Sequence, residues 1–170
     1  MTNHKSRRIV LPRSALFVLV MLLSISSCQT STGETSTSSA VVEGFIKAMN
    51  AGDVEASLAF LTDDAVIQFV PPPIPEDDGV FTGKEEIRGW YENVARNNGH
   101  SELSNVQING DAVTAQLSYS DDGLKQMGLD SIDNEWMVTV KGGLIQGYQV
   151  TMTDASFEKL MAALAAAQAE

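Results

Sequence analysis

Few side chains in this sequence have the type and spacing that acid–base or metal chemistry requires. His100 is the only histidine beyond the first four residues, and a single histidine where a helix gives way to a strand is usually exposed and inert. Asp64 and Glu135 are carboxylates that could act as a general base if an apolar cavity raised their pKa. The paired acids at 77–78 and 121–122 lack metal-ligand spacing. The catalytic candidates are therefore weak, and neither a metal nor a cofactor is expected.

The single cysteine, Cys28, has the setting for a different chemistry, the attachment of lipid. It follows Ser26 and Ser27, a nine-residue apolar run over 15–23 and a basic stretch over 5–13. A cysteine directly after these parts of a secretory signal makes the segment resemble a bacterial lipoprotein signal. The resemblance implies lipidation of Cys28 and anchoring to a lipid bilayer of the cell envelope, at the outer face of the cytoplasmic membrane or in the outer membrane. Gln29 would favour the outer membrane.

Other interpretations of the N-terminus stay open. An ordinary secretory signal could be cut near Ser26 or Ser27, whereas nine apolar residues fall short of the roughly 20 that an uncleaved spanning helix needs. Four of the 11 Lys and Arg residues precede Cys28, and all 22 Asp and Glu residues follow it. The processed chain would thus be strongly acidic, which argues against nucleic acid as a partner. Lipidation would leave no thiol for a disulfide.

The segment over 28–39 is rich in Ser and Thr and contains no large apolar residue. Such a segment buries too little surface to fold and predicts a flexible tether. Residues 40–170 suffice for one domain with a single core. The expected organisation is a signal peptide over 1–27, a tether over 28–39 and a domain over 40–170.

Apolar spacing predicts the helices of this domain. A first helix is expected between a cap at Ser39 and Gly52, and a second is expected from a cap at Asp53 through Leu58 and Leu61. A third helix is expected over 84–97. A final helix, starting after Thr153 or Asp154, carries an apolar stripe of Phe157, Leu160, Met161 and Leu164.

Alternating residues predict strands over 65–70, 103–108, 113–119, 132–141 and 144–152. Two of the connections are the tight-turn pairs at 109–110 and 142–143. A proline-rich acidic loop over 71–79 and a polar segment over 120–130 interrupt the sheet. This order predicts an α+β domain, in which a curved antiparallel sheet carries helices on one side.

Four segments in this order resemble the nuclear transport factor 2-like superfamily, in its SnoaL-like branch. They are 45–53, 61–66, 83–87 and the paired terminal strands that contain Trp136. The resemblance covers nearly all of 40–170 and implies a sheet wrapped into a cone around N-terminal helices, with a C-terminal helix. Members include ketosteroid isomerases, polyketide cyclases, dehydratases, epoxide hydrolases and binding proteins without chemistry, so this fold does not fix a function.

The active sites of these enzymes do not carry over to this sequence. The tyrosine of the ketosteroid isomerases corresponds to Phe45, and their carboxylate base falls at Phe69 or Val70. The epoxide hydrolases use an Asp-Arg-Asp clamp, but Arg88 and Arg96 have no assignable carboxylate partners here.

Two functional hypotheses follow. The favoured one is a membrane-anchored extracytoplasmic domain that binds a small apolar ligand or a protein partner without catalysis; the family also suggests a homodimer. The alternative is a SnoaL-like isomerase, cyclase, dehydratase or hydrolase that uses a pocket carboxylate. Trp136 shares one strand face with Asn134 and Val138, but alternation does not show whether that face or that of Glu135 is concave. The expected ligand-binding residues are aromatic or polar: Phe45, Gln68, Phe69, Trp90, Tyr91, Gln116 and Trp136.

Overall fold

The first helix is longer than the sequence predicts. The computed structural model describes residues 31–73 and 78–168, so the expectations on Cys28 and on 1–27 lie outside the described residues. Helix α1 spans Ser31–Asn50, and the predicted helix start at Ser39 was wrong. Serine and threonine disfavour a helix by only a fraction of a kcal/mol each, and extending an existing helix needs no new nucleus.

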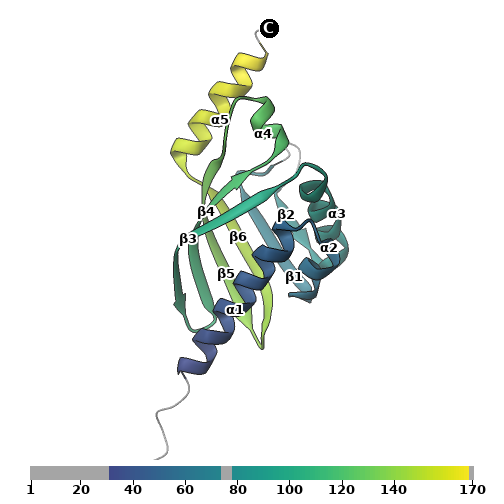
Figure 1. Cartoon of the computed structure of the whole chain (residues 1–170), viewed down its shortest axis with the longest axis vertical. Helices are drawn as coiled ribbons and strands as arrows, with labels where there is room; N and C mark the ends of the chain where they lie inside the picture. Colours follow the sequence, from purple (N-terminus) through teal and green to yellow (C-terminus); the bar gives the residue numbers. More distant parts are fainter. Residues whose placement is uncertain (1–30, 74–77, 169–170) are drawn as a thin grey trace, which may run out of the picture. The chain divides into compact units, whose positions relative to one another are not determined.

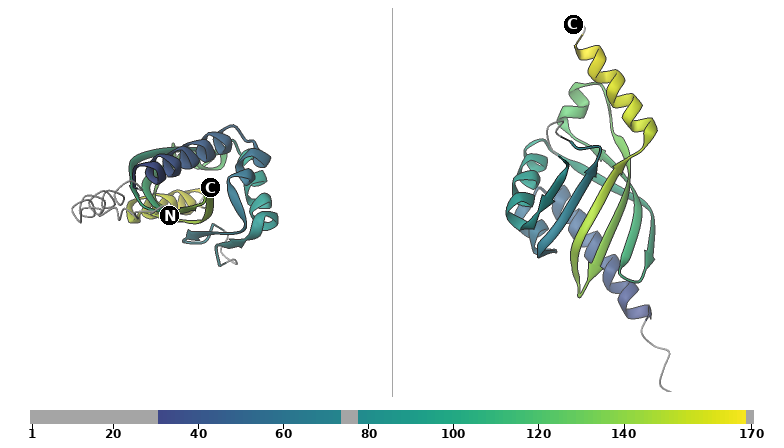
Figure 2. Two further views of the ribbon diagram at one scale, coloured as in Figure 1. Left: turned by 90° about the horizontal axis from the view of Figure 1, so that it is seen from below. Right: turned by 180° about the vertical axis from the view of Figure 1, so that it is seen from behind.

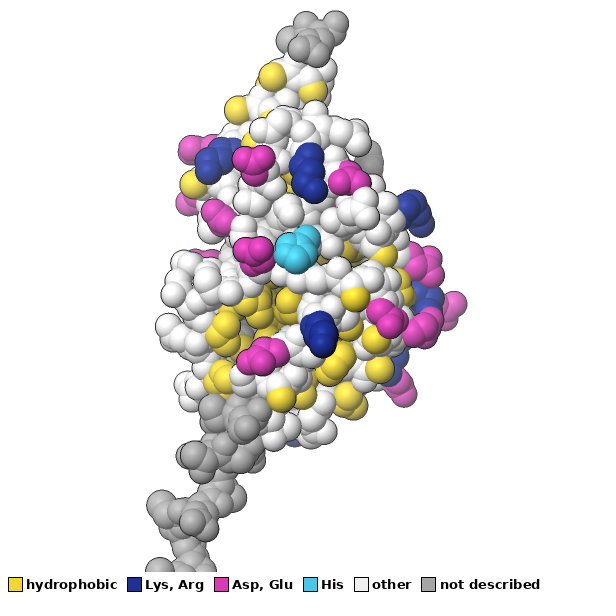
Figure 3. All heavy atoms as spheres, in the orientation of Figure 1, with side chains coloured by type: hydrophobic (Ala, Val, Ile, Leu, Met, Phe, Trp, Pro, Cys, Tyr) yellow, Lys and Arg dark blue, Asp and Glu magenta, His cyan; other side chains and the backbone are white. Residues whose placement is uncertain are grey.

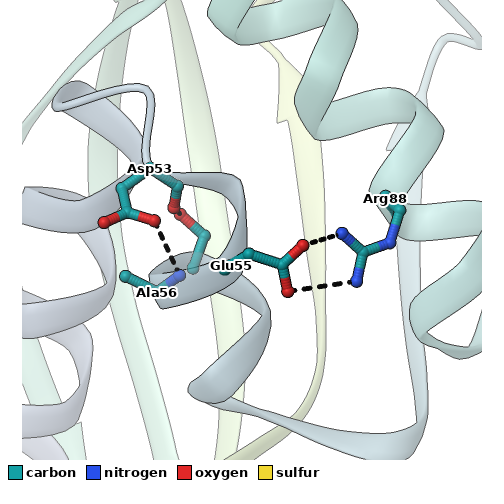
Figure 4. Close-up of polar contacts among 5 residues, drawn as sticks. Asp53, Glu55, Ala56 and Arg88 are labelled. Atoms are coloured by element: carbon teal, nitrogen blue, oxygen red, sulfur yellow. Dashed lines mark hydrogen bonds and ion pairs between the residues drawn. The ribbon is translucent and has the colours of Figure 1, made fainter.

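Two shorter helices follow. Helix α2, Val54–Ala59, is capped by Asp53, whose carboxylate accepts a hydrogen bond from the Ala56 amide at 2.9 Å (Figure 4). Helix α3 spans Gly83–Arg96, and its Arg88 forms a two-bonded ion pair with Glu55 of α2 (Figure 4). This pair ties α2 to α3. The second helix was expected to reach Leu61, but this fully buried residue opens the first strand instead.

Six strands form one curved sheet in the order β2-β1-β6-β5-β4-β3. Their bounds are Leu61–Val70 (β1), Val80–Thr82 (β2), His100–Asn109 (β3), Ala112–Ser120 (β4), Ile132–Lys141 (β5) and Leu144–Met152 (β6). The pairing of β1 with β6 is parallel and all other pairings are antiparallel. The sheet is therefore mixed, because β1 reaches β6 only after the chain has crossed over through α3 and the β3–β5 meander.

The curved sheet and the helices enclose one hydrophobic core. Helix α1 lies across the concave side of the sheet and α3 packs on β1 (Figures 1 and 2). Phe45 of α1 and Tyr91 of α3 are among the largest fully buried side chains. The predicted α+β class, with its curved sheet, N-terminal helices and C-terminal helix, is confirmed.

Two helices stand at one end of the sheet (Figure 1). The short helix α4, Asp122–Gln126, lies in the polar segment for which no helix was predicted. Helix α5, Asp154–Ala167, is capped by Thr153, one of the two caps that the sequence offered, and Ser156 is its one buried residue. Among the described helices, none combines the length and the hydropathy needed to cross a bilayer.

Candidate functional site

A cavity of about 660 Å³ lies between the concave side of the sheet and the helices. Helices α1 and α3 form one wall, strands β1, β4, β5 and β6 form another, and α4 and α5 contribute residues at the end where they stand. Aromatic side chains are prominent in its lining: Phe45, Phe69, Phe81, Trp90, Tyr119, Trp136 and Tyr148. The cavity is thus predominantly apolar, as small-molecule sites usually are.

Strand alternation decides which side chains reach the cavity. On β5, Asn134, Trp136 and Val138 are buried, whereas Glu135 and Met137 between them are exposed. The register places Trp136 opposite Val150 of β6, and both line the cavity. The concave face is therefore the face of Asn134 and Trp136, which the sequence alone left undecided.

The aromatic rings form a connected cluster around Phe45. The ring of Phe45 stacks on Trp136 at a centroid distance of 6.2 Å and lies 5.9 Å from Tyr148. Phe69 contacts Trp90 at 4.8 Å and extends the cluster to α3. Such ring pairs stabilise beyond their buried area, by about 0.5–1.5 kcal/mol each. They also hold flat apolar surfaces in fixed positions along the cavity.

Two buried tyrosines of this cluster hydrogen-bond to each other. The hydroxyl oxygens of Tyr91 and Tyr148 are 3.2 Å apart. Burial raises the pKa of both phenols, and for Tyr91 the neighbouring Tyr148 raises it further. Both side chains are therefore neutral at physiological pH. Of the two, only Tyr148 lines the cavity.

The polar groups in the cavity wall already serve structural roles. Asp121 caps α4 by accepting a hydrogen bond from the Leu124 amide at 2.7 Å, and it also accepts one from the Tyr119 hydroxyl at 3.1 Å. The Asn134 side-chain nitrogen donates to the carbonyl oxygens of Leu117 and Ile132, both at 3.3 Å. Among the described lining residues, Asp121 is the only one with an ionisable carboxylate, and no histidine, lysine or arginine joins it.

The structure brings together four of the seven residues expected to bind a ligand. Phe45, Phe69, Trp90 and Trp136 line the cavity, and Tyr91 lies behind them in the core. The two glutamines lie elsewhere. Gln68 alternates with the inward-facing Ile67 and Phe69, and Gln116 lies on the other side of the sheet, where it accepts a hydrogen bond from Asn105 at 2.7 Å. These glutamines are polar because they lie on the outer face of the sheet and not because they line the cavity.

None of the three catalytic candidates lines this cavity. Asp64 is exposed on β1. Glu135 lines a second, smaller pocket on the outer side of the sheet, beside Gln116. The side chain of His100 is 51% exposed, and its nearest carboxylate, that of Glu102, is 3.5 Å away. The described residues also contain no group of three or more His, Cys, Asp or Glu side chains that could hold a metal ion.

Residues from α4 and α5 line the cavity although the sequence did not assign them to a pocket. They are Leu124, Leu160 and Leu164, joined by Met127, which follows α4. The apolar stripe of the last helix was visible in the sequence. What could not be seen is that Leu160 and Leu164 of that stripe face the cavity, because this depends on how α5 is placed against the sheet.

Comparisons with known proteins are consistent with this architecture. A family model described as a SnoaL-like domain matches residues 42–148. Similar solved structures include a nuclear transport factor 2-like protein of unknown function from Cytophaga hutchinsonii, with 16% identity, a TM-score of 0.56, and coverage of 77% of this chain and 99% of that chain. None of the curated proteins compared with the chain matches it.

Two further solved structures are those of a protein with a bound ligand and of an enzyme. Rv0760c from Mycobacterium tuberculosis, in complex with estradiol-17beta-hemisuccinate, has 17% identity, a TM-score of 0.60, and coverage of 71% of this chain and 96% of that chain. The epoxide hydrolase/cyclase-like enzyme SalBIII has 19% identity, a TM-score of 0.59, and coverage of 71% and 94%. At these identities the likeness concerns the fold alone. Together with the family match over 42–148, it shows that the chain belongs to the family of SnoaL-like domains.

Proposed function

We propose that this chain is a binding domain for a small apolar molecule and that it performs no catalysis. The observation that carries the proposal is the cavity of about 660 Å³ with its aromatic wall. Small-molecule sites typically enclose about 300–1,000 Å³ and combine apolar walls with a few polar groups. The volume and the chemistry of this cavity both fit that description.

The state of the polar groups favours binding over catalysis. A general base must be within reach of the substrate, and Asp121, the one carboxylate among the described lining residues, is held by structural hydrogen bonds from the Tyr119 hydroxyl and the Leu124 amide. Asp64, Glu135 and His100 are outside the cavity. By the resemblance, Phe45 corresponds to the tyrosine of the ketosteroid isomerases and Phe69 or Val70 to their base, and all three side chains supply only apolar surface to the cavity.

The steroid derivative in the complex with Rv0760c supports a ligand with rings. That protein shares its fold with this chain but little of its sequence, so the comparison concerns the kind of cavity and not the particular ligand. Flat rings also suit a cavity that is lined by aromatic side chains.

Binding can be tested with the uncharged fluorophore N-phenyl-1-naphthylamine. Both tryptophans of the chain, Trp90 and Trp136, line the cavity, so energy transfer from tryptophan reports on a probe bound there. We expect saturable binding to the full chain, and an affinity about tenfold weaker in Trp136→Ala, equivalent to roughly 1.4 kcal/mol.

The matched control for this experiment is Met137→Ala. Met137 is adjacent on β5 but 53% exposed on the opposite face, so its replacement should leave the affinity unchanged. Circular dichroism would verify that each variant is folded. Binding that does not saturate, or that both variants weaken equally, would contradict a ligand in this cavity.

The proposal also includes a lipid anchor at Cys28, which would place the domain outside the cytoplasm at the cell envelope. Its support is the sequence before the cysteine, a basic stretch, an apolar run and two serines. Metabolic labelling with an alkyne fatty acid tests it in a bacterial host. The wild-type chain should carry the label and Cys28→Ala should not, and equal labelling of both would refute the anchor.

A further inference from the structure

We propose that the ligand has two chemically distinct parts, a flat ring system joined to an alkyl chain. The cavity provides a separate compartment for each part. The inference rests on the proposed binding function and specifies the class of ligand. In this arrangement the rings occupy the end near α1 and α3, and the chain occupies the end beneath α4 and α5.

The aromatic compartment is formed by side chains that contact one another through their rings. They are Phe45, Phe69, Phe81, Trp90, Trp136 and Tyr148. Because these rings pack against each other, their positions are fixed, and rigid planar walls favour a planar ligand that stacks or meets them edge to face.

The aliphatic compartment has a different composition. Its walls are Leu124, Met127, Ile132, Met152, Leu160 and Leu164. Tyr119, opposite Ile132, is the one aromatic side chain in the described lining at this end, and its hydroxyl donates to Asp121. The other side chains carry no ring, and two are methionines, whose unbranched thioether side chains adapt to irregular shapes. Such walls suit a flexible alkyl chain better than a rigid ring.

The strands show that the two compartments lie end to end. Along β5 the inward-facing residues run from Trp136 through Asn134 to Ile132, and along β6 they run from Tyr148 through Val150 to Met152. Four residues of strand span about 13 Å. The cavity is therefore elongated along the strands, and beyond Asn134 its lining is mainly aliphatic, with Tyr119 as the aromatic exception.

Helix α5 leaves apolar surface at the aliphatic end. Ser156 is its one buried residue, and Leu164 is 37% exposed although it lines the cavity. Hydrophobic side chains are visible on the surface along this helix (Figure 3). An alkyl chain lying against Leu160 and Leu164 would remove some of this surface from water, which is the main favourable term in apolar binding.

Displacement of N-phenyl-1-naphthylamine from the full chain by three probes tests the inference. The probes are phenol, 1-octanol and 4-octylphenol, which represent the ring, the chain and both joined together. We expect 4-octylphenol to bind at least about tenfold more tightly than either part, because it fills both compartments.

Variants of α5 locate the chain and exclude a general effect of hydrophobicity. The double variant Leu160→Asn and Leu164→Asn makes the aliphatic compartment polar, whereas Phe157→Asn and Met161→Asn make the same change on the same helix at residues outside the cavity lining. We expect the first pair to weaken the affinity for 4-octylphenol about tenfold and to leave the affinity for phenol within about twofold of the wild-type value. The second pair should affect neither probe.

The outcomes separate this inference from the proposed function. Equal effects of the two double variants on 4-octylphenol, or no effect of either, would overturn the two-compartment ligand, while continued binding of the fluorophore would uphold a binding cavity. If wild-type protein bound neither the fluorophore nor any of the three probes, the proposed function itself would fail. Because neither pair of side chains belongs to the buried core, all variants should keep the wild-type circular dichroism spectrum.

Discussion

At the scale of single residues, the hydrogen bond between Tyr91 and Tyr148 shows how a buried polar pair is arranged behind an apolar cavity. Each hydroxyl is the only side-chain partner of the other in the part of the chain that the structure describes. A buried hydroxyl without a partner keeps its full desolvation penalty. The two tyrosines are therefore energetically coupled, although only one of them lines the cavity.

This coupling predicts the outcome of a double-mutant cycle. We expect Tyr148→Phe to lower the free energy of unfolding by about 1–3 kcal/mol, because the Tyr91 hydroxyl stays buried without a partner. The double variant with Tyr91→Phe should lose less than the sum of the two single variants, since it leaves no orphaned hydroxyl. Urea denaturation measures all four proteins. As a control, Tyr119→Phe affects a different hydrogen bond, so its loss of unfolding free energy should add to that of Tyr91→Phe. Strict additivity of the losses for Tyr91→Phe and Tyr148→Phe would contradict the coupling.

At the scale of elements, the parallel pairing of β1 with β6 brings Phe69 beside Val150 and Tyr148 beside Ile67. It therefore holds together two strands of the same cavity wall. The pairing depends on close backbone approach at Gly147, where a side chain would clash with the carbonyl oxygen of Val66. Glycine fits at this point because it has no Cβ atom.

The close approach predicts that Gly147→Ala is destabilising. We expect the free energy of unfolding to fall by about 1–3 kcal/mol, as for overpacked sites, because the obstructing atom belongs to the backbone and cannot rotate away. The matched control is Gly89→Ala in α3, where a Cβ atom would meet nothing within 4 Å. That change should raise the free energy of unfolding by up to about 1 kcal/mol through helix propensity. If Gly147→Ala proved as stable as wild type in urea, the close approach would not constrain the pairing.

The same elements show what the sequence could and could not predict. Helical stripes and strand alternation predicted most of the elements, because each is a local pattern of burial. The parallel pairing of β1 with β6 joins segments some 80 residues apart, so no local pattern reveals it. Alternation on β5 correctly assigned Glu135 and Trp136 to opposite faces of the strand, but only the curvature of the sheet shows which of them faces the cavity. The contribution of Leu160 and Leu164 likewise follows from the placement of α5.

At the scale of the whole molecule, every tyrosine of the chain is at least partly buried. The sequence contains three tyrosines, and burial raises the pKa of Tyr91, Tyr119 and Tyr148. In the unfolded chain each would ionise near its ordinary pKa of about 10. The folded protein therefore retains protons that the unfolded chain releases, and this difference links folding to alkaline pH.

The sign of the effect follows from this linkage. Below about pH 10 the three tyrosines are protonated in both states, so their contribution to stability is fully present. As pH rises above 10 towards the raised native pKa values, the unfolded state is increasingly favoured, by up to about 4 kcal/mol per pH unit for three groups. We expect tyrosinate absorbance at 295 nm to appear together with the loss of circular dichroism. Both should occur at a pH well above the ionisation midpoint of N-acetyltyrosinamide in the same buffers. The double variant Tyr91→Phe and Tyr148→Phe should show a shallower fall of stability with pH, because Tyr119 is then the only tyrosine left. Ionisation near pH 10 in protein that keeps its circular dichroism would mean that the tyrosine hydroxyls are accessible to water, and it would contradict their burial.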